Sequence, residues 1–440
     1  MTAGLPVFSA DKYIGDVDSV DLMRQNGKVR QLIGVVIESL GPHMAIGETC
    51  HIQYKRTAEP VLAEVVGFRD NKVLIMPLGD LMGIGAGSEV VTLGKPLEIG
   101  VTDDLLGRVL DGLGHPIDGH GRIFAGRRAQ IAASPPPALS RRRITQPLAL
   151  GIRAIDGLLT CGKGQRAGVF AGSGVGKSTI LGMIARNTSA DVNVIALIGE
   201  RGKEVRDFIE RDLGEEGLRR SVVVVSTSDQ PALVRIKAAF VATTIAEYFR
   251  DQGLDVMFMM DSVTRFAMAQ REVGLAIGEP TTTRGYTPSV FAMLPKLLER
   301  AGTAQTGTIT GLYSVLVDGD DMNEPVADAV RSILDGHIVL SRKLAAANHY
   351  PAIDVLASVS RVMPDVVDQN HSSAASAVRD VLSTYREAED LINIGAYVQG
   401  SNPRVDLALS KIESVRHYLK QDIYETATFE QAHSGLLGIA

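Results

Sequence analysis

Residues 171–179 read AGSGVGKST, between an apolar run and a helix-like stretch, Thr179–Arg186. A strand, a glycine-rich turn and a helix that opens with a lysine and a serine form a cradle for nucleotide phosphates. Backbone N–H groups and the positive end of the helix dipole face the phosphates, Lys177 reaches the β and γ phosphates, and Ser178 ligates Mg²⁺. The first glycine of the usual pattern is Ala171 here, a small residue at the strand end. The predicted nucleotide-binding residues are Gly172, Ser173, Gly174, Val175, Gly176, Lys177, Ser178 and Thr179.

Composition narrows the class of protein. With 440 residues, the chain is long enough for about three domains, and its apolar and charged fractions, 45% and 22%, are those of a globular protein. No run approaches the roughly 18 apolar residues of a membrane span, and the N-terminus lacks a signal-peptide pattern. Two cysteines, Cys50 and Cys161, are too few for a disulfide framework. The net charge of −6 argues against a broadly basic nucleic-acid binder. We therefore expect a cytoplasmic protein that binds no nucleic acid.

The chain divides into three zones. Residues 1–95 contain short alternating apolar runs that predict a small antiparallel β-barrel, preceded by an N-terminal arm that is either a docking segment or a frayed terminus. Residues 96–365 are predicted to form the nucleotide-binding domain, and their first part, 96–146, is a glycine-, proline- and arginine-rich connector laid over its surface. Residues 366–440 are predicted to be a helical domain. The barrel runs are Gln31–Ile37, Cys50–Tyr54, Val61–Phe68 and Lys72–Pro77.

The middle zone alternates apolar strands with longer helical patterns. This alternation predicts an α/β domain with a mostly parallel sheet covered on both faces. The expected strands are Arg166–Phe170, Val192–Ile198, Ser221–Ser226, Val256–Met260 and Thr308–Leu316. The expected helices between them are Met183–Ala185, Val205–Leu213, Leu233–Arg250 and Val263–Gly274. Beyond residue 365 the pattern is helical to the end, with Ala374–Ile394 and Arg404–Lys420 interpreted as a solvated cap.

Two carboxylates at strand ends are candidates for chemistry. Asp261 follows the strand Val256–Met260 and is expected to hold the Mg²⁺ shell. Its alternative role is to cap the helix that begins near Ser262. Glu200 follows Val194–Ile198 and is placed to polarise the attacking water, unless it is a surface residue in a turn.

Two arginines are candidates for neutralising charge on the transferring γ-phosphoryl group. Arg361 follows the apolar run Val355–Val359, which is expected to be a strand. Arg265 lies four residues past Asp261 and is an equally plausible phosphate ligand. The residue pattern alone leaves both assignments open.

Motifs spread over most of the chain resemble those of the catalytic subunits of rotary ATPases. These motifs are GIRAIDG (151–157), GSGVGKST (172–179), GERGKEVR (199–206) and DSVTRF (261–266). Three others, DGDDMNEP (318–325), DGHIVLSR (335–342) and HYPAIDV (349–355), look like those of the ATPases of type III protein export. The stretches EPTTTRGYTPS (279–289) and IGAYVQGSN (394–402) are more similar to the flagellar branch than to the injectisome branch. The resemblance runs from about residue 20 to beyond 420.

The resemblance implies a RecA-like P-loop core and Mg²⁺-dependent ATP hydrolysis. It makes Glu200 the catalytic carboxylate, Arg201 a phosphate-site arginine and Arg265 the arginine after the metal-site aspartate. Arg361 would reach into the site of a neighbouring subunit. Since Glu200 and Arg361 occur in one chain, a homo-oligomer can complete every interface, and the resemblance implies six subunits.

The resemblance also implies partners and a base-binding region. Gly285–Pro288 resembles a loop that faces the central pore, where a stalk protein sits. The aromatic that stacks on adenine would fall near Ser373, which cannot stack, so Tyr350 and Pro351 are candidates for adenine contacts. The other implied partners are a regulator or stator, chaperone–substrate complexes and the membrane export gate. We therefore expect the protein at the cytoplasmic face of the inner membrane, bound peripherally.

Four alternatives compete with a flagellar export ATPase. An injectisome ATPase would share its motifs. A subunit of an ion-translocating rotary ATPase is disfavoured because one chain holds both Glu200 and Arg361. A nucleic-acid translocase such as the transcription terminator Rho would need exposed aromatic residues among basic residues in the β domain. Residues 1–95 contain few aromatic residues and no basic cluster. A non-catalytic nucleotide-binding module is disfavoured by the presence of Glu200.

Overall fold

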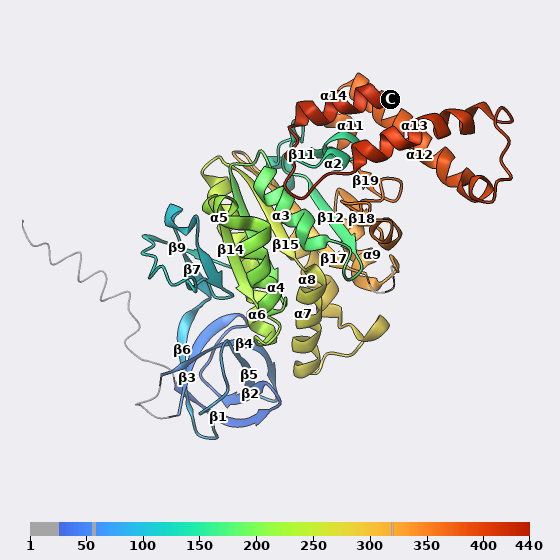
Figure 1. Cartoon of the computed structure of the whole chain (residues 1–440). Helices are drawn as coiled ribbons and strands as arrows, with labels where there is room; N and C mark the ends of the chain where they lie inside the picture. The colour runs from blue at the N-terminus through green and yellow to red at the C-terminus, as the bar shows by residue number, and fades with distance from the viewer. Residues whose placement is uncertain (1–25, 55–58, 318, 320) are drawn as a thin grey trace, which may run out of the picture. The chain divides into compact units, whose positions relative to one another are not determined.

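The computed structural model describes residues 26–54, 59–317, 319 and 321–440 (Figure 1). The expected N-terminal arm lies outside the described residues, and the 318–325 motif is described only in part. The chain falls into two compact units, Met1–Leu97 and Glu98–Ala440.

The described part of the first unit is a closed barrel, as predicted. Alternate residues point inward, among them Ile37, Cys50 and Ile75, and closure pairs the strand edges. The run Gln31–Ile37 is not one strand, because Gly34, with a φ of +60°, opens a two-residue turn in its middle. Around the barrel the strands are β1 (Asn26–Ile33), β2 (Val36–Leu40), β5 (Lys72–Pro77), β4 (Val61–Arg69), β3 (Glu48–Gln53) and β6 (Glu89–Pro96).

The second unit is built on a mostly parallel sheet, which confirms the α/β prediction. Its strands, in order across the sheet, are β19 (Val359–Ser360), β18 (Gly336–Leu340), β12 (Arg166–Ala171), β17 (Thr308–Leu316), β15 (Asp255–Asp261), β13 (Val192–Ile198), β14 (Ser221–Ser226) and β8 (Val109–Asp111). The strands from β18 to β8 are parallel, whereas β19 and the short β16 (Gly302–Thr303) pair antiparallel. The carboxyl ends of the parallel strands therefore share one edge.

Helices connect the strands of this sheet. They are α2 (Arg153–Leu158), α3 (Lys177–Asn187), α4 (Gly202–Asp207), α5 (Gly214–Arg219), α6 (Ala232–Asp251), α7 (Val263–Ile277), α8 (Pro288–Leu298), α9 (Pro325–Ile333), α10 (Arg342–Ala346) and α11 (Met363–Val366). The long α6 packs against β13, β14 and β15, and the segment Phe208–Leu213 after α4 is a turn of π-helix. Within the described ranges, no helix combines the length and apolarity needed to cross a membrane.

The connector 96–146 differs from its prediction as a surface layer. It forms a small sheet of β7 (Glu98–Val101) and β9 (Arg127–Gln130), and it supplies β8, the last strand of the main sheet. Val109 of β8 pairs with Val223 of β14, and Leu105 and Leu110 are buried. Because this short apolar run covers an otherwise open sheet edge, the connector is part of the core.

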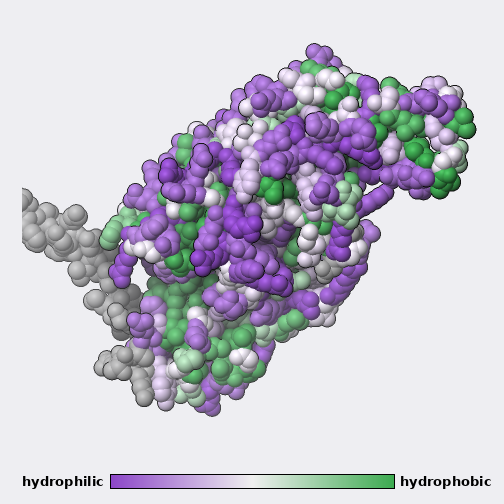
Figure 2. Space-filling model, viewed as in Figure 1, coloured by the Kyte–Doolittle hydropathy of each residue, from purple (hydrophilic) through white to green (hydrophobic). Residues whose placement is uncertain are grey.

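The C-terminal region consists of α12 (Gln369–Asn393), α13 (Pro403–Leu419) and α14 (Phe429–Ile439). The first two form a hairpin whose tip exposes apolar side chains (Figures 1 and 2). The exposed apolar residues there are Leu391, Ile394, Val398 and Leu407. The pattern predicted helix to the end of the chain, and this prediction is wrong between the last two helices. The chain leaves the helix at Lys420 and enters α14 only after Thr428, where a capping box with Gln431 starts the new helix.

Candidate nucleotide and catalytic site

The phosphate-binding loop joins β12 to α3. Gly174 and Gly176 have φ angles of +80° and +92°, which only glycine adopts readily. The N-cap of α3 is Gly176, which has no side chain to satisfy the first N–H groups of the helix. Those N–H groups and the positive end of the helix dipole therefore favour an anion such as a phosphate. Lys177 is the first residue of α3 and therefore also lies at the N-terminus of this helix.

Two carboxylates and one ammonium group meet next to this loop. The Lys177 ammonium group contacts Asp261 and lies 3.6 Å from Oε1 of Glu200. Asp261 ends β15 and Glu200 follows β13, and their side chains are only 5% and 12% exposed. The sheet thus brings together, at its carboxyl edge, three residues that the sequence placed at separate strand and helix ends.

The environment of Glu200 holds a proton unusually tightly. Burial, and then the negative charge of Asp261, raise the pKa of Glu200 to about 7, while the Lys177 cation opposes the change. Oε1 of Glu200 is buried and accepts no hydrogen bond in the described structure. A carboxylate with a pKa near neutrality and an oxygen that accepts no hydrogen bond from the described residues is suited to accept a proton from water.

Ser314 is a site residue that the sequence analysis missed. Its hydroxyl group, on β17 next to β15, donates a 2.6 Å hydrogen bond to Oδ1 of Asp261, and both side chains are buried. A serine inside the buried run Thr308–Val315 was the available signal, because a buried hydroxyl needs a partner. The alternative role of Asp261 as a helix cap is wrong. Ser262 is the N-cap of α7.

The two arginines near Glu200 have different surroundings. A Cβ on Gly199 would lie 2.8 Å from Cβ of Arg265, so this glycine lets Arg265 pass beside Glu200. Nε of Arg265 is buried and has no hydrogen-bond partner in the part of the chain that the structure describes. By contrast, the Arg201 side chain is 80% exposed and lies 3.7 Å from Glu204. The structure therefore brings Arg265 to the catalytic corner and leaves Arg201 in solvent.

The expected strand Val355–Val359 is mostly a turn. Oδ1 of Asp354 accepts hydrogen bonds from the N–H groups of Leu356 and Ala357, which bends the chain. Only Val359 and Ser360 pair with the sheet, as β19.

This arrangement places Arg361 far from the phosphate loop of its own chain. Ser360 pairs with Gly336 at the start of β18, and the N–H of Arg361 donates to the carbonyl of Asp335. The phosphate loop follows the opposite end of the neighbouring β12. At about 3.3 Å per residue, the length of β12 corresponds to about 17 Å. Arg361 is exposed, and the structure does not assemble it with Lys177 and Glu200.

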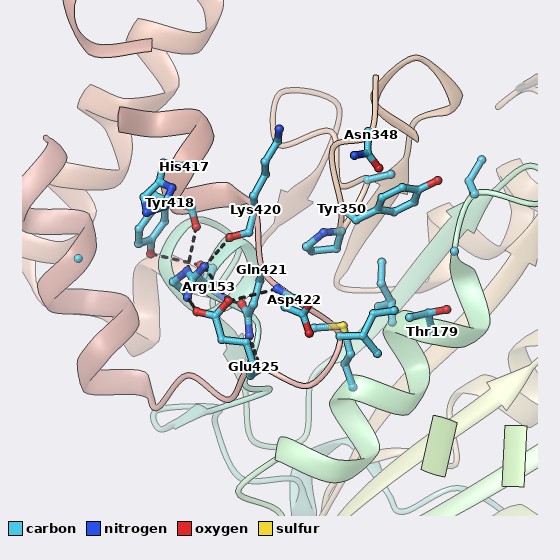
Figure 3. Close-up of a pocket in the computed structure, with 18 of the residues that line it drawn as sticks. Arg153, Thr179, Asn348, Tyr350, His417, Tyr418, Lys420, Gln421, Asp422 and Glu425 are labelled. Carbon is cyan, nitrogen blue, oxygen red and sulfur yellow. Dashed lines mark hydrogen bonds and ion pairs between the residues drawn. The ribbon is translucent and has the colours of Figure 1, made fainter. Parts of the chain in front are cut away.

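A cavity of about 1260 Å³ opens from the phosphate loop toward the C-terminal helices (Figure 3). Tyr350 and Pro351, the candidates for adenine contacts, line it, and a Cβ on Gly176 would lie 3.7 Å from the Tyr350 ring. Ser373, where the stacking aromatic was expected, does not line the cavity and lies exposed on α12. The sequence analysis also missed the wall formed by Gln421, Asp422 and Ile423. These residues carry no recognisable motif.

The residues at the loop fit a magnesium ion. Mg²⁺ prefers oxygen ligands, and the hydroxyl group of Ser178 and the carboxylate of Asp261 provide them. Oε1 of Glu200, which lies 3.6 Å from the Lys177 ammonium group and accepts no hydrogen bond from the described residues, lies in the same corner. When bound there with a nucleotide, Mg²⁺ would neutralise charge on the phosphate oxygens.

Comparisons with known proteins agree with this fold. Models of the ATP synthase alpha/beta family match residues 29–94, as its β-barrel domain, and residues 151–360, as its nucleotide-binding domain. The model of the type III secretion (EscN) ATPase C-terminal domain matches residues 367–437.

Individual relatives match over nearly the whole chain. The flagellum-specific ATP synthase of Bacillus subtilis is 54% identical, over 96% of this chain and 97% of the relative. The type 3 secretion system ATPase of Xanthomonas euvesicatoria is 51% identical, over 92% of each. Among solved structures, assembled EscN from enteropathogenic E. coli, in complex with its central stalk EscO, is 47% identical with a TM-score of 0.87, over 94% of this chain and 99% of EscN. The chain therefore belongs to the ATP synthase alpha/beta family, in the branch of the flagellum-specific and type III secretion ATPases.

Proposed function

We propose that this chain hydrolyses Mg²⁺-ATP at the subunit interfaces of a homo-oligomeric ring and thereby powers type III protein export. One observation carries the interfacial part of this proposal. Glu200 and Lys177 lie at the carboxyl edge of the sheet, whereas Arg361 lies near the opposite edge and is exposed. An arginine in that position is better placed to serve a neighbour's site than its own.

Each residue of the site has a distinct role in this proposal. The phosphate loop and Lys177 bind the β and γ phosphates, and Ser178 and Asp261 hold Mg²⁺. Glu200 orients the attacking water and accepts its proton, which its raised pKa favours near neutral pH. Arg265 of the same chain and Arg361 of the neighbour stabilise the charge on the transferring phosphoryl group.

Tyr350, with Pro351, contacts the adenine base in this proposal. Arg201, which the resemblance placed at the phosphates, would have to turn inward to contact them, because its side chain lies in solvent.

The assembly and the partners follow from the relatives. Because EscN has been solved as an assembled ATPase with its central stalk, we propose a ring of six copies of this chain around a stalk near Gly285–Pro288. A regulator or stator, chaperone–substrate complexes and the membrane export gate would be the further partners, at the cytoplasmic face of the inner membrane. The flagellar branch is the proposed one, because residues 279–289 and 394–402 resemble it most.

A mixing experiment tests the interfacial site. Glu200→Gln and Arg361→Ala are expected to lose nearly all ATPase activity separately, by roughly 10³-fold or more. In rings assembled from a one-to-one mixture, about one interface in four combines an intact Glu200 with a neighbour's intact Arg361. ATP hydrolysis should therefore reappear on mixing, and the specific activity of the wild type should rise with protein concentration.

Arg404→Ala, at an exposed position on α13, is the matched control and should keep wild-type activity. If mixed rings are shown to form yet remain inactive, and the wild-type specific activity is constant on dilution, Arg361 does not act in trans.

A further inference from the structure

The segment between α13 and α14, residues 420–428, forms a wall of the cavity opposite the phosphate loop, and we call it the C-terminal strap. It is tied to the proposed base-binding residue by the backbone. The N–H of Gln421 donates a 3.0 Å hydrogen bond to the carbonyl oxygen of Tyr350. The position of Tyr350 therefore depends on where the strap lies.

The Gln421 side chain fixes the strap through both ends of its amide. Oε1 accepts a 2.9 Å hydrogen bond from the N–H of Arg153, and Nε2 donates to the carbonyls of Gly151 and Glu425 at 2.8 and 3.0 Å. Gln421 is only 5% exposed, so these bonds are shielded from water. Figure 3 shows Gln421 beside Arg153 and Glu425. The amide supplies one acceptor and two donors in the positions required. A carboxylate of the same shape would turn an acceptor toward two carbonyl oxygens.

The Gly151 carbonyl, which accepts the hydrogen bond from Nε2 of Gln421, belongs to a rigid turn. Gly151 has a φ of +75°, and a Cβ there would collide with Asn187, the last residue of α3. The N–H of Gly151 donates a 2.8 Å hydrogen bond to Asp156, which is fully buried. The strap is thus anchored next to the far end of the helix that begins at the phosphate loop. The Gln421 side chain bonds the strap to residues 151–153, and its backbone N–H bonds the strap to Tyr350.

We propose that Gln421 is a positioning residue for the nucleoside half of the site. Its amide holds the strap and Tyr350 in place, so that the base is bound between them, whereas the phosphates are bound without its help. The inference rests on the proposed function, because it takes the cavity to hold a nucleotide. The inference predicts an effect on base binding alone, since no atom of Gln421 is needed at the phosphate loop.

The test separates the two halves of the ligand. Binding of Mg²⁺-ADP and of Mg²⁺-tripolyphosphate, which has no base, is measured by calorimetry for the full-length wild type, Gln421→Met and Gln421→Glu. Both variants should bind ADP at least about tenfold more weakly while tripolyphosphate affinity changes less than about threefold, since each variant loses buried hydrogen bonds on the base side only. Gln270→Met, which removes a buried amide bonded to Ser289 on another helix, should leave both affinities unchanged.

Equal weakening for both ligands, or none for ADP, would overturn the inference. Failure of the wild type to bind either ligand would instead contradict the proposed function.

A second measurement uses the wild type alone, so its result cannot be affected by a variant that fails to fold. Amide hydrogen exchange is measured at Gln421 of the wild type, whose N–H donates to Tyr350. ADP should slow this exchange at least about threefold, because it holds Tyr350 and the strap together, whereas tripolyphosphate should not. The same protection with both ligands would contradict a role confined to the base.

Discussion

The phosphate end of the proposed nucleotide site and its base end, in the adjoining cavity, are built in different ways. At the phosphate end, Lys177, Glu200 and Asp261 each stand at the end of a regular element, and ionic contacts hold them together. At the base end, Tyr350 and Gln421 come from irregular segments that hydrogen bonds to the backbone hold in place. The positions of the charged residues depend on where strands and helices end. The positions of Tyr350 and Gln421 depend on hydrogen bonds between loops.

The phosphate end should respond strongly to pH. Because burial and Asp261 raise the pKa of Glu200 from its ordinary value of 4.5 to about 7, the carboxylate becomes protonated as pH falls through 7. The value of kcat/KM for ATP should therefore fall about tenfold per pH unit below 7, or about 100-fold at pH 5. Initial rates measured from pH 5 to 9 check this. Glu204→Gln should move the midpoint downward, because Glu204 also raises this pKa.

The sign of the accompanying stability change is fixed by the same pKa. Between about 4.5 and 7 the folded protein keeps a proton that the unfolded chain loses, so the free energy of unfolding decreases as pH rises. The melting temperature of Glu200→Gln, whose amide is neutral, should rise relative to the wild type across this range. A kcat/KM profile that stays flat from pH 5 to 7 would exclude Glu200 as the titrating base.

An intermediate effect on Mg²⁺-dependent ADP binding is expected from loss of the buried Ser314 hydroxyl group. Ser314→Ala removes the 2.6 Å hydrogen bond to Asp261. A hydrogen bond to a charged group contributes about 1.5–3 kcal/mol, so the gain in ADP affinity on adding Mg²⁺ should shrink about tenfold. Titration with ADP in the presence of Mg²⁺ and of a chelator measures this gain.

Thr310→Val is the matched control for Ser314→Ala. It removes a buried hydroxyl on the same strand, one that accepts a hydrogen bond from Gly164 rather than contacting Asp261. It should lower the melting temperature but keep the full Mg²⁺ effect. Should the two variants show the same Mg²⁺ effect, Ser314 does not position Asp261.

The smallest effect is expected from the outer anchor of the strap. Glu425 contacts the Arg153 guanidinium, but its side chain is 40% exposed, and such pairs contribute less than about 1 kcal/mol. Glu425→Gln should weaken ADP binding by only about threefold, and less at high salt. Calorimetric titration at two salt concentrations measures both effects.

Glu413 lines the same cavity, but its ion pair is with Arg416 on its own helix, so Glu413→Gln should have no effect on ADP affinity. A loss with Glu425→Gln as large as that of Gln421→Met would mean that ionic contacts, not the Gln421 amide, hold the strap.

The fold was largely predictable from the sequence because its elements are strongly periodic. The strands Val192–Ile198 and Ser221–Ser226 have the predicted bounds, since continuous apolar runs between turn signals leave little choice. The prediction failed at Val355–Val359, where the Asp354 side chain bends an apolar run into a turn. It also failed at Gln31–Ile37, where one glycine turns the chain. In both places a local polar or conformational preference outweighed apolar patterning.

The site was predictable only in part. Lys177, Glu200 and Asp261 stand in short motifs with a chemical reason for each residue, whereas Ser314 is a single serine within an apolar strand. Gln421 follows a helix and belongs to no motif, and 268 residues separate it from its partner Arg153. Contacts across such a separation follow from the docking of α13 and α14 on α2, which periodicity does not encode.

The sequence by itself determined the phosphate loop, the order of strands and helices and the identity of the charged residues, because these depend on local backbone preferences and on side-chain chemistry. The tertiary structure alone decided which of those residues meet. It joined Glu200 to Lys177, set Arg361 near the opposite edge of the sheet and closed the cavity with the strap. The reason is that the distance between two side chains depends on sheet order and helix docking, and these are set by packing over the whole unit.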